Sequence, residues 1–414
     1  TGYQRRVQVR ALSHRRSTVA RRFWRTGRQV VPNGQSMHPS SPIVGPGANP
    51  AEGTGGSADI ASPCVHPPAP DRQGAPASIP RPSTRGSSVR TPLVTVILPA
   101  KDAGAYIGTT LETLTRQFDD PASLKFVAID DGSRDDTGTL MRRYAERFPH
   151  AEVIVNPRPK GLASARNQGL EHLEGDAFCF LDGDDWMQPQ RLSVLARRLN
   201  ELGCDFLRTD HVTVKTGVRT LVPAPYPWRE TVGSPREAIL PDDEPTMVDY
   251  PFAWAGIMHR RLIDQGLAGF TPGLFTAEDR PWIWRLHLQA RSFAVVDAPA
   301  LLYRRGVSTS LTQVRDRRQL DFVRAMGEVL DIVEADAESD RFLPKAVWSV
   351  MALSSRHLVR SRRMTPSLRG EMRAGLRGLL GRLPEREASA VLSRLDGPRR
   401  RVLAPLLRTV GIAA

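Results

Sequence analysis

The fold class is decided by the stretch AEVIVNPRPKGLASARNQGLEHLEGDAFCFLDGDDW, residues 151–186. It opens with an apolar, β-branched run, AEVIVN, and a second apolar run, DAFCFL, lies near its end. Between the two runs, residues 161–173 have the spacing of a helix. Two apolar strands joined through a helix form a βαβ unit, in which the strands are parallel and helices cover the sheet.

The same alternation continues on the N-terminal side of this stretch and for one helix beyond it. We expect strands at 94–98, 124–130, 151–156 and 176–181, and helices at 105–117, 135–148, 161–173 and 189–202. The predicted fold class is therefore α/β. In open α/β sheets, ligands bind outside the carboxyl ends of the strands. The residues that follow each strand are the candidates for a functional site.

Carboxylates gather at the end of the strand 176–181. Asp182, Asp184 and Asp185 follow it within four residues, and Gly183 separates the first two. Like charges this close repel, and a hard divalent cation such as Mg²⁺ or Mn²⁺ removes the repulsion by taking oxygen ligands. For the motif alone, a solvated acidic turn or a helix N-cap is the alternative. The polar loops that follow the other strands favour the cation site.

Those other loops also carry polar side chains. Asp130 and Asp131 end the second strand, where a carboxylate can accept hydrogen bonds from a base or a ribose, although a DDGS turn alone is more often structural. Arg166 lies in the first turns of a helix whose N-terminus favours a diphosphate, and an exposed helix arginine is the alternative. Glu278 and Asp279 precede a helix start, where the helix dipole alone favours acids.

Five segments, taken together, resemble the family 2 glycosyltransferases. In chain order they are VTVILPAKDAG, AIDDGSRDDT, KGLASARNQGL, FLDGDDW and AEDRPW. The resemblance covers about residues 92–312, and the motifs are specific jointly rather than singly. It implies the GT-A fold, a Rossmann-like mixed sheet that binds a nucleotide-sugar.

The resemblance also implies roles for individual residues. Asp182 and Asp184 would be the ends of the family's DXD motif, with Asp184 as the metal ligand and Asp182 as a contact to ribose or water and a second ligand. Asp279 would be the catalytic base of the ED motif, which takes the proton of the acceptor hydroxyl in an inverting transfer. The implied cofactor is Mn²⁺ or Mg²⁺. The implied nucleotide-sugar contacts are Pro99, Ala100, Asp102, Asp131 or Asp130, Arg166, Asp182 and Gly183.

Aromatic side chains are the candidates for the acceptor side. Trp254, Trp282 and Trp284 could stack on a sugar, with packing the more common role for at least two of the three, and Glu278 is a further candidate. The chain departs from the family at Lys101 and Asp102, where Tyr and Asn are frequent, and at Gly306, where a metal-binding His is frequent. The remaining candidates for phosphate contacts in that last segment are Arg304, Arg305 and Ser310.

Composition divides the chain into three parts. Residues 1–90 are rich in Arg, Pro, Gly and Ser without periodicity, which predicts a disordered extension. Residues 91–312 are the predicted GT-A catalytic domain, and residues 313–414 are predicted to be helical and Arg-rich. In this last part, one helix face would carry Leu368, Met372, Leu376, Leu379, Leu380 and Leu383. Such a face packs on the enzyme or on a second copy, or it binds an anionic membrane surface peripherally.

The formal net charge of +14 lies at the two ends of the chain. Residues 1–90 hold 13 Arg and three acids, and residues 356–414 hold 14 Arg and four acids, so the middle of the chain is net negative. This distribution argues against a nucleic-acid partner for the part with a core. No apolar run reaches the roughly 18 residues of a membrane span. Three cysteines without a paired spacing favour a cytoplasmic setting, with peripheral contact at the inner face of the membrane as an option.

The sequence therefore predicts an inverting glycosyltransferase that moves a hexosyl or N-acetylhexosaminyl group from a nucleotide-sugar, with UDP preferred. The acceptor would be a hydroxyl of a cell-surface polysaccharide, a polyol-phosphate polymer or a lipid-linked glycan. A sugar nucleotidyltransferase is one alternative, but the Gly-rich phosphate loop expected after its first strand is missing. A non-catalytic protein that binds polyanions through its basic ends is the other alternative.

Overall fold

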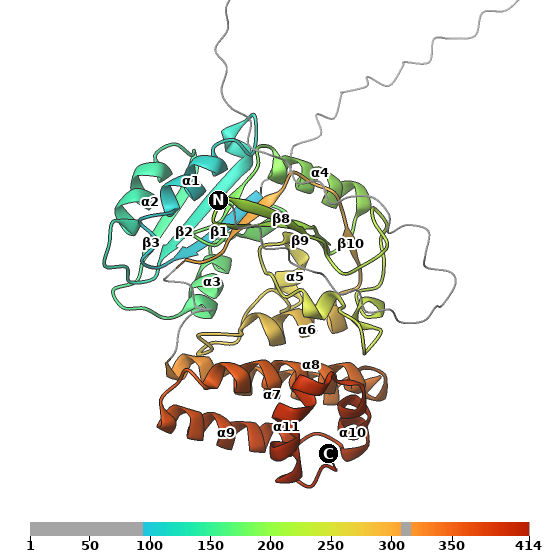
Figure 1. Cartoon of the computed structure of the whole chain (residues 1–414). Helices are drawn as coiled ribbons and strands as arrows, with labels where there is room; N and C mark the ends of the chain where they lie inside the picture. Colours follow the sequence, from blue (N-terminus) through green and yellow to red (C-terminus); the bar gives the residue numbers. More distant parts are fainter. Residues whose placement is uncertain (1–93, 308–315, 414) are drawn as a thin grey trace, which may run out of the picture. The chain divides into compact units, whose positions relative to one another are not determined.

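The computed structural model describes residues 94–307 and 316–413, all within one compact unit of the chain. The predicted disordered extension 1–90 and the candidate Ser310 lie outside the described residues. The described part has an α/β region followed by a helical one, drawn in orange and red in Figure 1. The predicted α/β fold class with a helical C-terminal region is confirmed.

A seven-stranded mixed sheet forms the centre of the α/β region. Its order is β10-β6-β9-β4-β1-β2-β3. The strands β1, β2, β3 and β4 are parallel, and β9 runs antiparallel between β4 and β6. Every residue of β1, β2 and β4 is buried, as expected for strands covered on both faces. The strands are β1 (Val94–Ala100), β2 (Leu124–Asp130), β3 (His150–Val155), β4 (Ala177–Phe180), β6 (Phe206–Arg208), β9 (Gly256–His259) and β10 (Phe293–Val295).

The four predicted helices are present and are shorter than the sequence pattern. They are α1 (Ile107–Leu114), α2 (Thr137–Ala145), α3 (Leu162–Leu170) and α4 (Arg191–Leu202). Tight i→i+3 hydrogen bonds replace helical ones at both ends of α1, from Tyr106 to Ala103 and from Gln117 to Leu114. Figure 1 shows α1 and α2 on one side of the sheet and α3 on the other.

The helix α3 packs closely on β1 because Gly169 faces the strand. A Cβ atom at Gly169 would lie 2.3 Å from Cγ2 of Ile97. This contact fixes the height of α3 over the sheet and brings its N-terminus to the carboxyl ends of β1 and β2.

A second, four-stranded sheet has the order β5-β11-β7-β8. Its first strand starts directly after the acidic turn 182–185, and β11 pairs with it antiparallel, with Leu302 opposite Trp186. This pairing brings Leu301 and Leu302, more than a hundred residues later in the chain, next to the strand that follows the acidic turn. The strands are β5 (Trp186–Met187), β7 (His211–Lys215), β8 (Val218–Val222) and β11 (Leu301–Arg304).

The helical region packs on the α/β region through α6 and α7, which contact each other. The long helix α8 contacts α7, α9, α10 and α11. The remaining α-helices are α5 (Arg261–Asp264), α6 (Asp279–Gln289), α7 (Asp321–Glu334), α8 (Ser339–Ser361), α9 (Pro366–Leu380), α10 (Glu385–Arg394) and α11 (Gly397–Arg408). Short 3-10 helices cover Pro121–Ser123, Glu237–Ile239, Met247–Asp249 and Arg317–Leu320.

The apolar helix face predicted over 368–383 is buried. All six of its apolar residues are at most 9% exposed, and α9 contacts α7, α8 and α11. Of the alternatives for this face, the structure shows packing within the protein rather than a face left for a membrane. Among residues 94–307 and 316–413, no helix is long and apolar enough to span a bilayer.

Candidate active site

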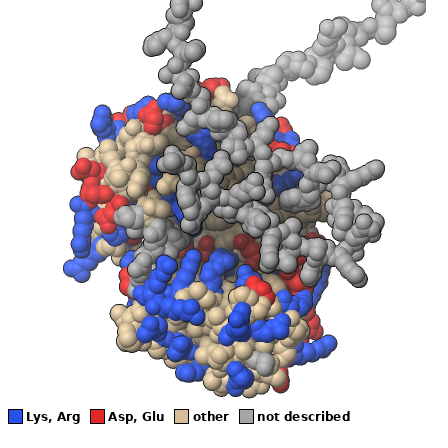
Figure 2. Space-filling model, in the orientation of Figure 1, with Lys and Arg blue, Asp and Glu red and all other residues tan. Residues whose placement is uncertain are grey.

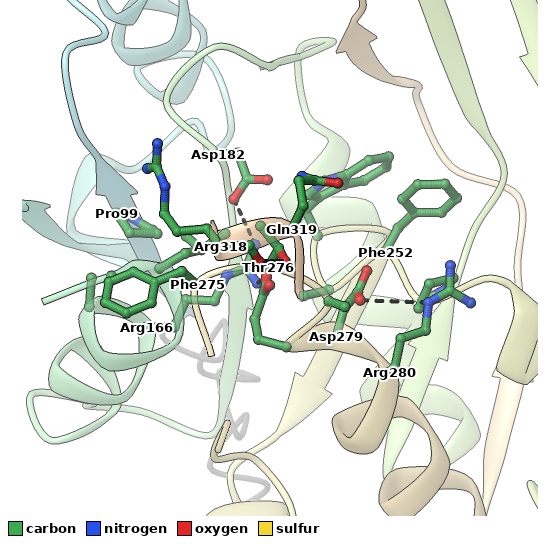
Figure 3. Close-up of a pocket in the computed structure, with 18 of the residues that line it drawn as sticks. Pro99, Arg166, Asp182, Phe252, Phe275, Thr276, Asp279, Arg280, Arg318 and Gln319 are labelled. Atoms are coloured by element: carbon green, nitrogen blue, oxygen red, sulfur yellow. Dashed lines mark hydrogen bonds and ion pairs between the residues drawn. The ribbon is translucent and has the colours of Figure 1, made fainter. Parts of the chain in front are cut away.

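A cavity of about 1020 Å³ opens at the carboxyl ends of β1, β2 and β4. Its walls include the acidic turn after β4, the first turns of α3 and the segment 275–280 that leads into α6 (Figure 3). The loops that the sequence analysis expected to converge thus meet at one place. Of the predicted contacts, the cavity is lined by Pro99, Ala100, Asp102, Asp131, Arg166, Asp182, Gly183, Asp184, Trp254, Glu278 and Asp279.

The acidic turn is pressed against the end of β1. A Cβ atom at Gly183 would lie 2.6 Å from the Cβ of Ala100, so only glycine fits without a shift. The Thr110 hydroxyl of α1 donates to the Gly183 carbonyl at 3.0 Å. This close approach leaves Asp182 and Asp184, on either side of the glycine, at the cavity wall.

Asp185, the third acid, points the other way and is fully buried. One of its carboxylate oxygens accepts a hydrogen bond from the Arg304 backbone N–H at 2.8 Å, and Arg304 Nε donates to the Asp184 carbonyl at 2.9 Å. Burial, followed by the charges of Asp184 and Asp182, raises the pKa of Asp185 well above its usual range. Asp185 therefore ties β11 to the turn.

Arg304 was a candidate for a phosphate contact, but it is not part of the cavity wall. Its guanidinium stacks over the Trp186 and Tyr106 rings, 4.5 Å and 4.9 Å from their centroids. The pairing of β5 with β11 places Arg304 beside the acidic turn and outside the cavity wall, where it supports the turn. Arg305, the next residue, lines the cavity instead.

The surroundings of Asp184 fit a divalent cation. Burial and the nearby charge of Asp182 raise the pKa of Asp184 to about 6, so a positive charge beside it would be strongly favoured. Oxygen donors with net negative charge are the ligands of Mg²⁺ and Mn²⁺. No group of three or more His, Cys, Asp or Glu side chains is arranged for a metal within the described ranges. The predicted site needs only one or two carboxylates from the protein, and it stays a prediction.

Arg166 joins two of the motifs. It is 3% exposed and donates to Asp182 at 2.9 Å, the dashed line at Asp182 in Figure 3, and to Glu278 at 3.0 Å. The rings of Phe270 and Phe180 lie against its guanidinium. Arg166 thereby holds the acidic turn next to the start of α6. The sequence did not show this bridging role, and the predicted contact to a diphosphate stays a prediction.

The structure separates the two acids that end β2. Asp131 lines the cavity, and its carboxylate accepts hydrogen bonds from the backbone N–H groups of Lys160 and Gly161, both at 2.8 Å. Asp130 does not reach the cavity, because its carboxylate accepts from Ser133 N–H at 3.0 Å and faces Gly138. The prediction left both open, and Asp131 is the one placed at the site.

Asp102 links the loops after β1 and β2. It has a left-handed backbone, φ 50°, and its carboxylate accepts a hydrogen bond from Arg134 N–H at 2.8 Å. It also forms an ion pair with Lys101. The hydrogen bond to Lys101, and then the one to Arg134, lower the pKa of Asp102. Asp102 is therefore an anion at the rim of the predicted nucleotide pocket.

Glu278 and Asp279 sit at the N-terminus of α6. Ala277, just before them, has φ 60°, a conformation that costs a non-glycine residue about 1–2 kcal/mol and often marks a functional site. Burial raises the pKa of both carboxyls, and the charge of Asp279 raises that of Glu278 further. The Asp279 side chain keeps 29% of its surface exposed, and Arg280 Nε lies 3.8 Å from its carboxylate.

The tryptophans have different positions. Trp282 is completely buried, stacks on Phe270 with a centroid distance of 5.2 Å and does not line the cavity, so it has the packing role that was expected for at least two of the three. Trp254 and Trp284 are nearly buried but reach the cavity wall. Trp254 stacks on Phe252, another residue of the wall, at 4.9 Å.

One wall of the cavity comes from the helical region, which the sequence analysis did not include in the site. Its α8 residues are Ser349, Ala352, Leu353, Arg356, His357 and Arg360. Their spacing of three and four indicates one helix face. The spacing can be read from the sequence, but the sequence does not show that this side of the helix lines the cavity.

Comparisons with known proteins agree with this fold. Residues 95–259 match the family model described as Glycosyl transferase family 2. The chain is 27% identical over 237 residues to the uncharacterized glycosyltransferase EpsJ of Bacillus subtilis, covering 56% of this chain and 66% of that protein. It is 35% identical over 112 residues to validoxylamine A glucosyltransferase of Streptomyces hygroscopicus subsp. limoneus, covering 27% of this chain and 25% of that protein.

Among solved structures, S. aureus TarS 1–349 in complex with UDP-GlcNAc is similar with a TM-score of 0.60 and 19% identity, covering 77% of this chain and 90% of that one. Residues 95–259 are thus a glycosyltransferase family 2 domain, and the fold is GT-A. The chain spans about two thirds or less of the length of the curated relatives it matches first.

Proposed function

We propose that the protein is an inverting glycosyltransferase that transfers a sugar from a nucleotide-sugar to an acceptor hydroxyl. One observation carries this proposal: a single cavity is lined both by the Asp182–Asp184 turn and by Asp279. The Asp182–Asp184 turn is suited to bind a donor diphosphate with its cation. Asp279 is a carboxylate with a raised pKa, which is suited to remove a proton.

Asp279 acts as the general base in this proposal. Its carboxylate takes the proton of the acceptor hydroxyl as the oxygen attacks the anomeric carbon from the face opposite the nucleotide. Burial favours this role, because a carboxyl with a raised pKa accepts a proton more readily than an ordinary one. Arg166 positions the reaction partners indirectly, since it holds Asp182 and Glu278 in fixed places.

The donor is proposed to lie against the ends of β1, β2 and β4. Pro99, Ala100 and Asp131 line that wall, and the Asp182–Gly183–Asp184 turn closes it. Mn²⁺ or Mg²⁺ would be held by Asp184 and Asp182, and it would offset the charge that develops on the departing diphosphate. Support for UDP as the nucleotide comes from S. aureus TarS, which has the same fold and binds UDP-GlcNAc.

The transferred group is proposed to be a hexosyl or N-acetylhexosaminyl unit. The proposed acceptor is a cell-surface polysaccharide, a polyol-phosphate polymer or a lipid-linked glycan. The volume of about 1020 Å³ is compatible with a nucleotide-sugar together with part of an acceptor, because sites for single small molecules commonly measure about 300–1,000 Å³.

A screen of nucleotide-sugars tests the proposal. UDP-, GDP-, dTDP- and ADP-sugars are incubated with the protein and Mn²⁺ or Mg²⁺, and release of the nucleoside diphosphate is measured together with its binding by calorimetry. We expect turnover of a UDP-sugar only with a divalent cation, and loss of metal-dependent UDP binding in Asp184→Ala. A protein that neither binds nor hydrolyses any nucleotide-sugar with either cation contradicts the proposal.

A further inference from the structure

The wall that α8 contributes to the cavity carries unpaired positive charge. Arg356 and Arg360 are one helical turn apart, and both line the cavity. Across the part of the chain that the structure describes, neither guanidinium has a carboxylate partner, whereas seven of the other sixteen arginines of the helical region do. In Figure 2, Lys and Arg gather over the helical region along the edge that borders a recess with acidic side chains.

Arg280 adds a third cation from the α/β region. It lines the same cavity at the start of α6, and its nearest acid is Asp279 at 3.8 Å. Burial and then the charges of Arg280 and Arg360 lower the pKa of Arg356. Arg280 and Arg360 therefore both lie within electrostatic reach of Arg356.

Apart from Asp279, 3.8 Å from Arg280, the nearby groups do not neutralise this cluster. Asp249 also lines the cavity, but Lys345 pairs with it at 2.6 Å. His357, between the two α8 arginines, has its pKa lowered to about 3 by burial and by Arg360 and Arg356, so it is neutral. Like charges one turn apart on a helix destabilise it slightly. Three clustered cations at a cavity wall are therefore costly unless an anion binds between them.

The cluster lies on the acceptor side of the proposed base. Glu278, on one side of Asp279 in the chain, is held by Arg166 next to the acidic turn of the donor wall. Arg280, on the other side, extends away from that wall, and Figure 3 shows it across Asp279 from Arg166 and Asp182. A group bound by Arg280 and α8 would thus approach Asp279 from the side opposite the donor.

We propose that Arg280, Arg356 and Arg360 bind a phosphate group of the acceptor, so that the hydroxyl to be glycosylated belongs to a phosphate-bearing molecule. This inference rests on the proposed function, because it names the substrate class of that site. Arginine suits such a group, since its planar fork gives two parallel hydrogen bonds to phosphate oxygens. The phosphate could belong to a polyol-phosphate chain or to a lipid-linked phosphate, and the recognition chemistry is the same.

The test measures the binding of three probes to the full chain by calorimetry. They are a short glycerol-phosphate oligomer, the matching uncharged polyol, and a polyprenyl phosphate in detergent micelles. We expect at least one phosphate-bearing probe to bind and the uncharged polyol not to bind. Binding of the oligomer points to a polyol-phosphate acceptor, and binding of the micellar probe alone points to a lipid-linked one.

Variants connect the binding to the cluster. Arg356→Gln/Arg360→Gln should weaken probe binding by about tenfold or more, because each guanidinium loses its charged hydrogen bonds to the phosphate. The matched control is Arg362→Gln/Arg363→Gln, which removes the same charge from exposed positions at the end of α8 outside the cavity wall, and it should bind as the wild type does. Arg356→Lys/Arg360→Lys keeps the charge and should bind more tightly than the Gln pair, which separates charge from misfolding.

Binding of UDP with Mn²⁺ is measured on the same samples, so that the two proposals can fail separately. If UDP binds but no phosphate-bearing probe does, or if the Gln pair binds the probe as tightly as the wild type, the phosphate inference is overturned while the glycosyltransferase proposal stands. If a probe binds through Arg356 and Arg360 but no nucleotide-sugar binds, the anion site is supported and the proposed function fails.

Discussion

Glu278 and Asp279 are neighbours in the chain with different surroundings. Glu278 is 6% exposed, and its carboxylate is engaged by Arg166 at 3.0 Å. Asp279 has no contact this short with a cation, since Arg280 is 3.8 Å away, and part of its side chain faces the cavity. A base must be free to take a proton from a substrate. The structure therefore favours Asp279 as the base and Glu278 as a positioning residue.

Replacing the Asp279 carboxylate should remove transfer but not donor binding. In Asp279→Asn the side chain keeps its shape and loses the group that takes the proton, so kcat should fall by about 10²–10⁴-fold. The Kd for UDP with Mn²⁺ should stay close to that of the wild type. Asp297→Asn is the control, because Asp297 is exposed and lies outside the cavity wall. Full transfer activity in Asp279→Asn would show that another group is the base.

The raised pKa of Asp279 gives a pH dependence with a definite sign. A general base works only when it is deprotonated, so kcat/KM should fall as the pH drops through its pKa. Burial places that pKa above the ordinary value of 3.8. We expect an acidic limb at a higher pH than a normal aspartate gives, present in the wild type and in Glu278→Gln. It is measured as kcat/KM against pH, and a limb that vanishes in Glu278→Gln would assign the titration to Glu278 instead.

At the scale of helices and strands, the sequence was sufficient to predict those parts of the fold that depend on a local pattern of residues. The strand at 124–130 and the order of strands and helices up to α4 follow from apolar runs and helical spacing. The meeting of the acidic turn with Asp131 also follows, because parallel strands end at one edge of a sheet. Helix ends were predicted too long, since tight turns at the ends of α1 have the same composition as the helix.

Contacts between distant segments could not be predicted in the same way. The pairing of Arg166 with Glu278 joins residues 112 positions apart, and no local pattern encodes it. The supporting role of Arg304 depends on β5, a two-residue strand, pairing with β11. The cavity wall formed by α8 was missed for a related reason. Helical spacing shows which residues share one side of a helix, but what that side contacts depends on the tertiary structure.

The packing of α3 on β1 gives a test at this scale. Gly169→Ala places a Cβ against Ile97 in a filled space, and overpacking of this kind costs about 1–3 kcal/mol of unfolding free energy. Gly108→Ala in α1 is the matched control. No heavy atom lies within 4 Å of a Cβ there, so it should be neutral or stabilise the helix by up to about 1 kcal/mol. Urea unfolding compares the two, and equal effects would contradict the close contact between α3 and the sheet.

At the scale of the whole molecule, the helical region is part of the site rather than an addition to it. The ion pair between Lys345 of α8 and Asp249 joins the helix to a segment that itself lines the cavity. Lys345 is completely buried and also donates to the Glu244 carbonyl at 2.5 Å. The cavity wall that contains Arg356 and Arg360 is thus held to the α/β region by a buried polar contact, next to more exposed ion pairs such as Arg236 with Asp336 and Arg341 with Glu237.

Breaking that contact should loosen the wall and lower stability together. Lys345→Met keeps the length of the side chain and leaves Asp249 without its cation. Removing one partner of a buried pair costs about 3–5 kcal/mol, and because the Asp249 side chain is 28% exposed we expect about 1–3 kcal/mol here. Arg382→Gln is the control, since it breaks pairs with Asp331 and Glu334 on the surface, each worth at most about 1 kcal/mol. Urea unfolding gives the stabilities, and hydrogen exchange of α8 reports the local opening. A Lys345→Met protein as stable as the Arg382→Gln control, with unchanged exchange in α8, would mean that the Lys345–Asp249 pair is not needed to hold the helical region against the cavity.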